Sequence, residues 1–111
     1  MDLSKPINVD DLSFDRVVMQ SAMPVVVEFW SPSCMYCLKM AKVLDDLAKE
    51  FYGRALVAKV SVQDSPRLAA RFGVTGVPVF ILFKYGLILG QTTGAISKGR
   101  LKTALGMDIY V

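Results

Sequence analysis

The sequence predicts an α/β fold in which a mixed sheet carries helices on both faces. The run "PVVVEFW" at 24–30 is almost continuously apolar, as expected for a central strand that is covered on both sides. A helix-periodic segment then leads to a second run, 55–62, that is rich in β-branched residues. Two further runs, 78–84 and 87–93, stand two residues apart and predict an antiparallel hairpin. This order of helices and strands predicts the mixed sheet.

The elements of the first half follow from apolar spacing and from end signals. Residues 13–20 carry apolar side chains at helical spacing, and we expect Ser13 to be the N-cap of a short helix. The strand 24–30 comes next. Over 34–52, apolar residues recur every three or four positions, which predicts one long amphipathic helix ended by Gly53.

The second half completes the order. Cap candidates Asp64 and Ser65, with Pro66 in the first turn, predict a short helix that stops at Gly73. Ser97 is expected to cap the last helix. The predicted elements are the strand 55–62, the helix 64–73, the strands 78–84 and 87–93, and the helix 97–105. The tail "GMDIYV" either packs on the domain or mediates association, and packing is the more ordinary outcome.

Composition limits the classes of function. The chain has 111 residues and is 53% hydrophobic, enough for a single domain, 1–111, with its own core and no need of stabilising metals or disulfides. The net charge of +3 is spread along the chain, so nucleic-acid binding has little support. No apolar run has signal-peptide or membrane-spanning length, and we expect a soluble, cytoplasmic protein with no membrane partner. The chain has no histidine, which removes the commonest general base and zinc ligand.

The two cysteines, Cys34 and Cys37, indicate chemistry. The loop that they would close is too short to stabilise a fold. At a helix start, Cys34 would be favoured as the attacking thiolate, and Cys37, one turn on and facing inward, could resolve a mixed disulfide. Two unrelated packed thiols are an alternative. A metal site is another, although one pair supplies only two of the roughly four ligands needed and two chains would have to share it.

A carboxyl group in the first strand adds to this picture. Alternation places Glu28 on the same strand face as Val26 and Trp30, where burial would push it toward its neutral form. Glu28 could then hold or release a proton for Cys37, and Lys59 in the next parallel strand could lie beside it. Alternatively, the strand is shorter and Glu28 reaches solvent.

Pro78, read from pattern alone, is an ordinary proline at the start of a strand.

Taken together, these residues resemble the thioredoxin family from about Phe14 to Leu105. The match includes "VVVEFW", the C-x-x-C at a helix start, "AKVSV", "RFGVTGVPVFILFKYG" and "TGAISKGRL". The resemblance implies the thioredoxin fold, a central mixed sheet flanked by helices on both faces, and thiol-disulfide exchange. It makes Cys34 the exposed nucleophile and Cys37 the buried resolving thiol.

The resemblance also assigns the substrate groove. Pro78 matches the family's cis-proline, with Val77 offering backbone groups to an extended substrate segment. Gly76 and Gly94 match small positions beside the active site, and Trp30 matches the tryptophan that ends the strand before it.

Several positions depart from the family pattern. Glu28 stands where the family usually has Asp, and Ser33 replaces the tryptophan before the first cysteine. Lys42 occupies a position where a proline often kinks the helix, so we expect a straighter helix. Met35 and Tyr36 replace Gly-Pro between the cysteines. They either favour the dithiol, through an added backbone donor at Tyr36, and make a weaker reductant, or serve as apolar contacts for a partner.

The leading hypothesis is therefore a thioredoxin-like protein-disulfide oxidoreductase, monomeric, with a role in electron transport and cell redox homeostasis. It would use no cofactor beyond its redox-active disulfide, act on protein disulfides and receive electrons from a thioredoxin-reductase-like donor. An alternative is a binding or electron-transfer module of the same fold, held to one client and with little general turnover.

Overall fold

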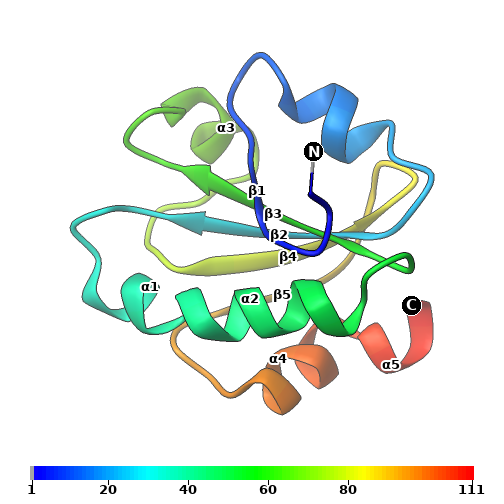
Figure 1. Ribbon diagram of the computed structural model, residues 1–111. Helices are drawn as coiled ribbons and strands as arrows, with labels where there is room; N and C mark the ends of the chain where they lie inside the picture. The colour runs from blue at the N-terminus through cyan, green and yellow to red at the C-terminus, as the bar shows by residue number, and fades with distance from the viewer. Residues whose placement is uncertain (1) are drawn as a thin grey trace.

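The computed structural model describes residues 2–111 and places one five-stranded sheet between two layers of helices (Figure 1). The strands lie in the order β1-β3-β2-β4-β5, with β1, β3 and β2 parallel and β4 antiparallel to both of its neighbours. The strands are β1 (Ile7–Asn8), β2 (Val25–Trp30), β3 (Leu56–Ser61), β4 (Val79–Lys84) and β5 (Leu87–Thr93). The helices are η1 (Asp15–Met19), α1 (Met35–Lys39), α2 (Ala41–Glu50), α3 (Pro66–Arg71), α4 (Lys98–Leu105) and α5 (Met107–Tyr110). The predicted fold class is confirmed.

Strand β2 is covered on both faces, as its apolar run predicted. Val25, Val27 and Phe29 point into one core, which η1 and α3 close. Val26 points into the other core, between the sheet and α2, α4 and α5. Figure 1 shows these two layers on opposite sides of the sheet. Two cores on one sheet hold β2 rigidly and fix the position of the loop that follows it.

Other predicted elements form with ends shifted by at most two residues, and β5 has the predicted bounds. Ser97 caps α4, because its Oγ accepts the Arg100 N–H at 3.2 Å. The hairpin turn has positive φ at Tyr85 (52°) and Gly86 (76°), the geometry that matches the twist of adjacent strands. Before α3, Ser65 is the N-cap residue, as one of the two candidates predicted, but its side chain makes no capping bond.

The first helix differs from the prediction. Residues Asp15–Met19 form a π-helix, in which the Gln20 N–H donates to Asp15 O at 2.9 Å. Ser13 is not its N-cap, which is Phe14 and makes no side-chain capping bond. The backbone N–H groups of Leu12 and Ser13 both donate to the carboxylate of Asp10. The side chain of Asp10, five residues before the π-helix begins, therefore holds the turn that leads into it.

The long helix is interrupted, so the prediction of one continuous and straighter helix is wrong. The Met40 N–H donates to Cys37 O three residues back, at 3.1 Å, and α2 restarts at Ala41. Met40 is buried in the same core as Leu44. The apolar spacing thus continues across the break, and side-chain periodicity cannot reveal it. Lys42 follows the break and does not prevent it.

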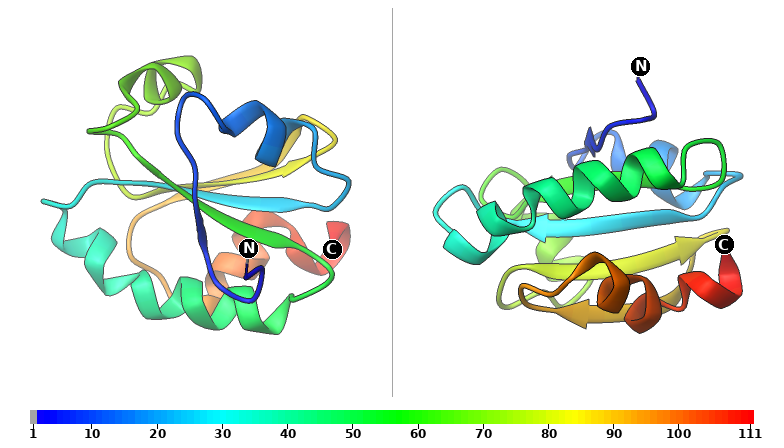
Figure 2. Two further views of the ribbon diagram at one scale, coloured as in Figure 1. Left: turned by 45° about the horizontal axis from the view of Figure 1, so that its top comes forward. Right: turned by 60° about the horizontal axis from the view of Figure 1, so that its bottom comes forward.

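The two shortest elements were not predicted. β1 has two residues and α5 has four, too few for periodicity to show. α5 buries Met107, so the tail packs on the domain. Figure 2 shows the C-terminal helix at the end of β4, where Lys84 Nζ donates to Tyr110 O at 3.3 Å.

Candidate active site

The two cysteines meet at the start of α1, directly after the loop that leaves β2. Cys34 is the N-cap residue and is partly exposed, whereas Cys37 is 3% exposed. The Cys37 N–H donates to Cys34 Sγ at 3.1 Å. Both residues are free thiols. A backbone donor aimed at the sulfur stabilises negative charge there, so this geometry suits Cys34 to react as a thiolate.

The backbone donor at Cys34 is not the one that the sequence suggested. Tyr36 was expected to add a donor, but the bond to Cys34 Sγ comes from the Cys37 N–H. A residue at position 36 therefore acts on this sulfur less directly than expected.

The loop before β4 lies against Cys34. The Val77–Pro78 peptide is cis, as the resemblance implied, and the Cys34 thiol lies 3.7 Å from Val77 O. A Cβ added at Gly76 or Gly94 would meet nothing within 4 Å, so both glycines border open space. A groove of about 420 Å³ runs between the loop of residues 73–79 and the end of β5. An extended segment could lie in it beside the Cys34 sulfur.

Glu28 is buried, and the alternative in which it reaches solvent is wrong. Its side chain is 1% exposed, and both carboxylate oxygens are without a hydrogen-bond donor among the described residues. Burial raises the pKa of Glu28 from 4.5 to about 7, and the positive charge of Lys59 works against this rise. Glu28 can therefore bind and release a proton near neutral pH.

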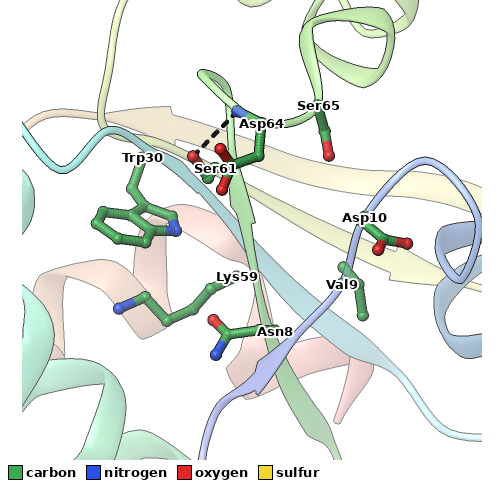
Figure 3. Close-up of a pocket in the computed structure, with 8 residues that line it drawn as sticks. All are labelled: Asn8, Val9, Asp10, Trp30, Lys59, Ser61, Asp64 and Ser65. Atoms are coloured by element: carbon green, nitrogen blue, oxygen red, sulfur yellow. Dashed lines mark hydrogen bonds between the residues drawn. The ribbon is translucent and has the colours of Figure 1, made fainter.

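Lys59 is the register neighbour of Glu28 on the adjacent parallel strand, as expected. Its ammonium group lies 4.5 Å from the centre of the Trp30 ring (Figure 3), and it forms no ion pair within the described part of the chain. The strand register fixes the backbone neighbours, whereas packing on the indole fixes the direction of the lysine side chain.

Trp30 and Lys59 line a cleft of about 400 Å³ that sequence reasoning missed. Figure 3 shows Asp10 and Asp64 on its other side, from the loops that follow β1 and β3. Parallel strands bring the loops that follow them to one edge of the sheet. Because β1 has only two residues, its strand could not be recognised in the sequence, and the cleft was missed with it. The cleft leaves the indole ring partly open to solvent.

Cys37 is held as a neutral thiol. Burial, followed by the hydrogen bond of its thiol with Cys34, raises the pKa of Cys37 to about 12, and the negative charge of Glu28 also raises it. Glu28 therefore acts on the Cys37 thiol through its charge. Cys37 needs a proton acceptor before it can attack. Glu28 is the buried carboxyl group whose charge acts on it.

Met35 and Tyr36 stand beside Cys34 with 69% and 60% of their surface exposed. They are free to touch a partner. Leu38, on the same helix, is 59% exposed. The sequence analysis did not select it as a site residue, although its place on the polar side of the predicted amphipathic helix indicated exposure. Lys39 Nζ lies 5.5 Å from the centre of the Tyr36 ring.

Comparison of the sequence with known proteins identifies the family to which the chain belongs. A thioredoxin family model matches residues 5–106. The chain belongs to the thioredoxin family. A thioredoxin of Haemophilus influenzae is 35% identical over 107 residues, covering 96% of this chain and all of that protein. A thioredoxin of Pseudomonas aeruginosa is 34% identical, over 93% of this chain and 95% of its own length.

A longer relative is similar to the same region. Thioredoxin M5, chloroplastic, of Oryza sativa is 39% identical over 92% of this chain, which spans 58% of that protein.

Membership of the thioredoxin family confirms the predicted enzyme class. Thioredoxins are disulfide oxidoreductases that act through an active-site dithiol, without a separate cofactor. Within residues 2–111, no helix is both long and apolar enough to cross a membrane.

Proposed function

We propose that this member of the thioredoxin family reduces or exchanges disulfides of protein substrates through Cys34 and Cys37. The observation that carries the proposal is the difference between the two sulfurs. Cys34 is partly exposed, receives a backbone N–H and lies beside Val77 O, whereas Cys37 is buried and feels the charge of Glu28. One sulfur can meet a substrate, and the other can act only on its neighbour.

The exchange proceeds in two displacements. Cys34 Sγ attacks one sulfur of the substrate disulfide, that S–S bond breaks, and the first substrate sulfur leaves as a thiolate. Cys37 then gives its proton to Glu28 and attacks Cys34 Sγ. The mixed disulfide breaks, the second substrate sulfur leaves, and a Cys34–Cys37 disulfide remains. The substrate gains two electrons, and the protein pair loses two.

The surrounding groups hold the substrate during these steps. Val77 and Pro78 would align an extended substrate segment through the backbone, and Gly94 leaves room for it. Trp30 forms the rim beside Lys59, whose charge favours the ionised form of Glu28.

The oxidised pair must be reduced again, and we propose a thioredoxin-reductase-like electron donor. A thiol-reducing compartment such as the cytoplasm would suit this cycle. Because every proposed site residue comes from one chain, a monomer would suffice.

The test is reduction of insulin disulfides with a dithiol as electron donor, together with the reduction potential of the pair read through Trp30 fluorescence. Insulin should be reduced catalytically. Stable covalent capture of insulin without turnover would contradict the proposal and favour a binding module. A potential close to that of a Gly-Pro thioredoxin would assign Met35 and Tyr36 to partner choice. A clearly more oxidising value would mean that they retune the dithiol.

A further inference from the structure

Helix α1 exposes an unusual amount of apolar surface for five residues. Met35, Tyr36 and Leu38 are 69%, 60% and 59% exposed, and each stands within four residues of the reactive Cys34. Isolated apolar side chains on a protein surface are ordinary, whereas a cluster beside a reactive group indicates contact with another molecule.

The side chains of α1 form two adjacent rows. Met35 and Leu38, three residues apart, lie next to each other on the helix surface. Tyr36 and Lys39 have the same spacing, and the Lys39 ammonium lies 5.5 Å from the centre of the Tyr36 ring. This contact limits the freedom of both side chains, so less entropy is lost when a partner binds them.

The charge on this surface is not neutralised. Lys39 makes no ion pair within residues 2–111, and α1 contains no acidic residue. The next carboxylates along the chain belong to α2, where Asp46 is paired with Lys42 at 3.1 Å. The complement of such a surface is apolar and carries a carboxylate.

We propose that the exposed face of α1, formed by Met35, Tyr36, Leu38 and Lys39, docks the substrate protein and selects among disulfides. The favoured substrate has apolar side chains and a carboxylate next to its disulfide. The inference rests on the proposed function, because docking at α1 delivers a disulfide to Cys34. The Val77 groove offers backbone groups and tolerates many sequences, whereas α1 offers side chains and discriminates among them.

Two disulfide-closed peptides of equal length test the proposal. One has Leu and Asp next to each cysteine, and the other has Ser and Lys. Hydroxyethyl disulfide, which is too small to reach across α1, reports the exchange chemistry alone. The reduced protein should react with the Leu/Asp peptide about tenfold faster than with the Ser/Lys peptide, as one or two favourable contacts allow.

The variants Leu38→Ser and Lys39→Glu should each reduce this preference by at least about threefold, with hydroxyethyl disulfide reacting at nearly the original rate. Matched controls lie elsewhere. Ile109→Ser removes an exposed aliphatic side chain from α5, at the far end of the molecule in Figure 1, and Lys49→Glu reverses an exposed charge on α2. Both controls should keep the wild-type preference.

A wild-type protein with equal rates for both peptides would overturn the proposal, as would a preference that survives Leu38→Ser and Lys39→Glu. Self-association that depends on concentration and is removed by Leu38→Ser would assign α1 to a second copy of the chain and overturn it as well. Failure to react with hydroxyethyl disulfide would overturn the proposed function itself, and the docking role with it.

Discussion

Two glutamates in this chain occupy opposite kinds of surroundings. Glu50, at the end of α2, lies 2.8 Å from Lys98 Nζ and 2.8 Å from Lys102 Nζ, both on α4. The hydrogen bonds from these lysines hold the pKa of Glu50 below its usual value. Glu28, in the centre of the sheet, has no donor among the described residues, and burial raises its pKa to about 7.

The difference indicates what each region does. A buried carboxyl group without donors destabilises a fold, so such a group is a candidate for a functional role. Here its charge acts on the Cys37 thiol, which must lose a proton. The Glu50 cluster joins two helices and lies away from the cysteines. Substitutions near Glu28 should therefore alter chemistry, and substitutions at Glu50 should alter only stability.

The largest effect is expected at Cys34. Cys34→Ser removes the attacking sulfur, and insulin reduction should fall at least about a thousandfold because no other thiol is accessible. Its thermal unfolding should stay close to that of the reduced wild type. Cys37→Ser is the matched variant: it should retain the first displacement and accumulate a mixed disulfide, visible by intact mass. Accumulation of that adduct in Cys34→Ser instead would reverse the assigned roles.

A change in pH-dependent stability comes next. Because the folded state holds the Glu28 proton to higher pH than the unfolded chain, the stability that Glu28 contributes is fully present below about pH 4.5. It falls as the pH rises through 7, by roughly 3 kcal/mol in all. Glu28→Gln should abolish this fall. Compared with the wild type at the same pH, the variant should therefore be more stable at pH 8 than at pH 5.

Urea unfolding of the reduced proteins at both pH values measures this difference. Parallel stability curves for wild type and Glu28→Gln between pH 5 and 8 would show that Glu28 does not titrate as its surroundings indicate.

The smallest effect is expected at Glu50. Glu50→Gln removes two ion pairs that are partly exposed and should reduce the free energy of unfolding by about 1 kcal/mol at pH 7. In the wild type, folding lowers the pKa of Glu50. The stability that Glu50 contributes is therefore present above its unfolded pKa and is lost as the pH falls through its folded pKa. Urea unfolding at pH 7 and pH 3 measures this. A loss of insulin reduction in Glu50→Gln would break the contrast between the two regions.

The sequence predicted most of the sheet because β2, β3 and the first strand of the hairpin are long apolar runs rich in β-branched and aromatic residues. It missed features that do not alter side-chain periodicity. The backbone break at Met40 leaves the apolar spacing intact, and the π-helix around Val18 has too few residues to show a period of its own. α5 is equally short.

In the site, the positions of Cys34, Cys37 and Glu28 followed from a local motif and from strand alternation. The direction of the Lys59 side chain did not, because it depends on packing against Trp30. The donor to Cys34 Sγ was also misplaced, since which N–H points at the sulfur is decided by the turn itself.

We propose that Glu28 accepts the proton of Cys37 during the second displacement. Stopped-flow reaction of the reduced protein with 5,5′-dithiobis(2-nitrobenzoate) separates the steps, since one coloured thiolate leaves when Cys34 attacks and another when Cys37 resolves the adduct. From pH 5 to 9, the second phase of the wild type should rise with an inflection near 7. In Glu28→Gln it should lose that inflection and slow about a hundredfold, far more than the first phase. An unchanged second phase in Glu28→Gln would show that Glu28 does not accept the Cys37 proton.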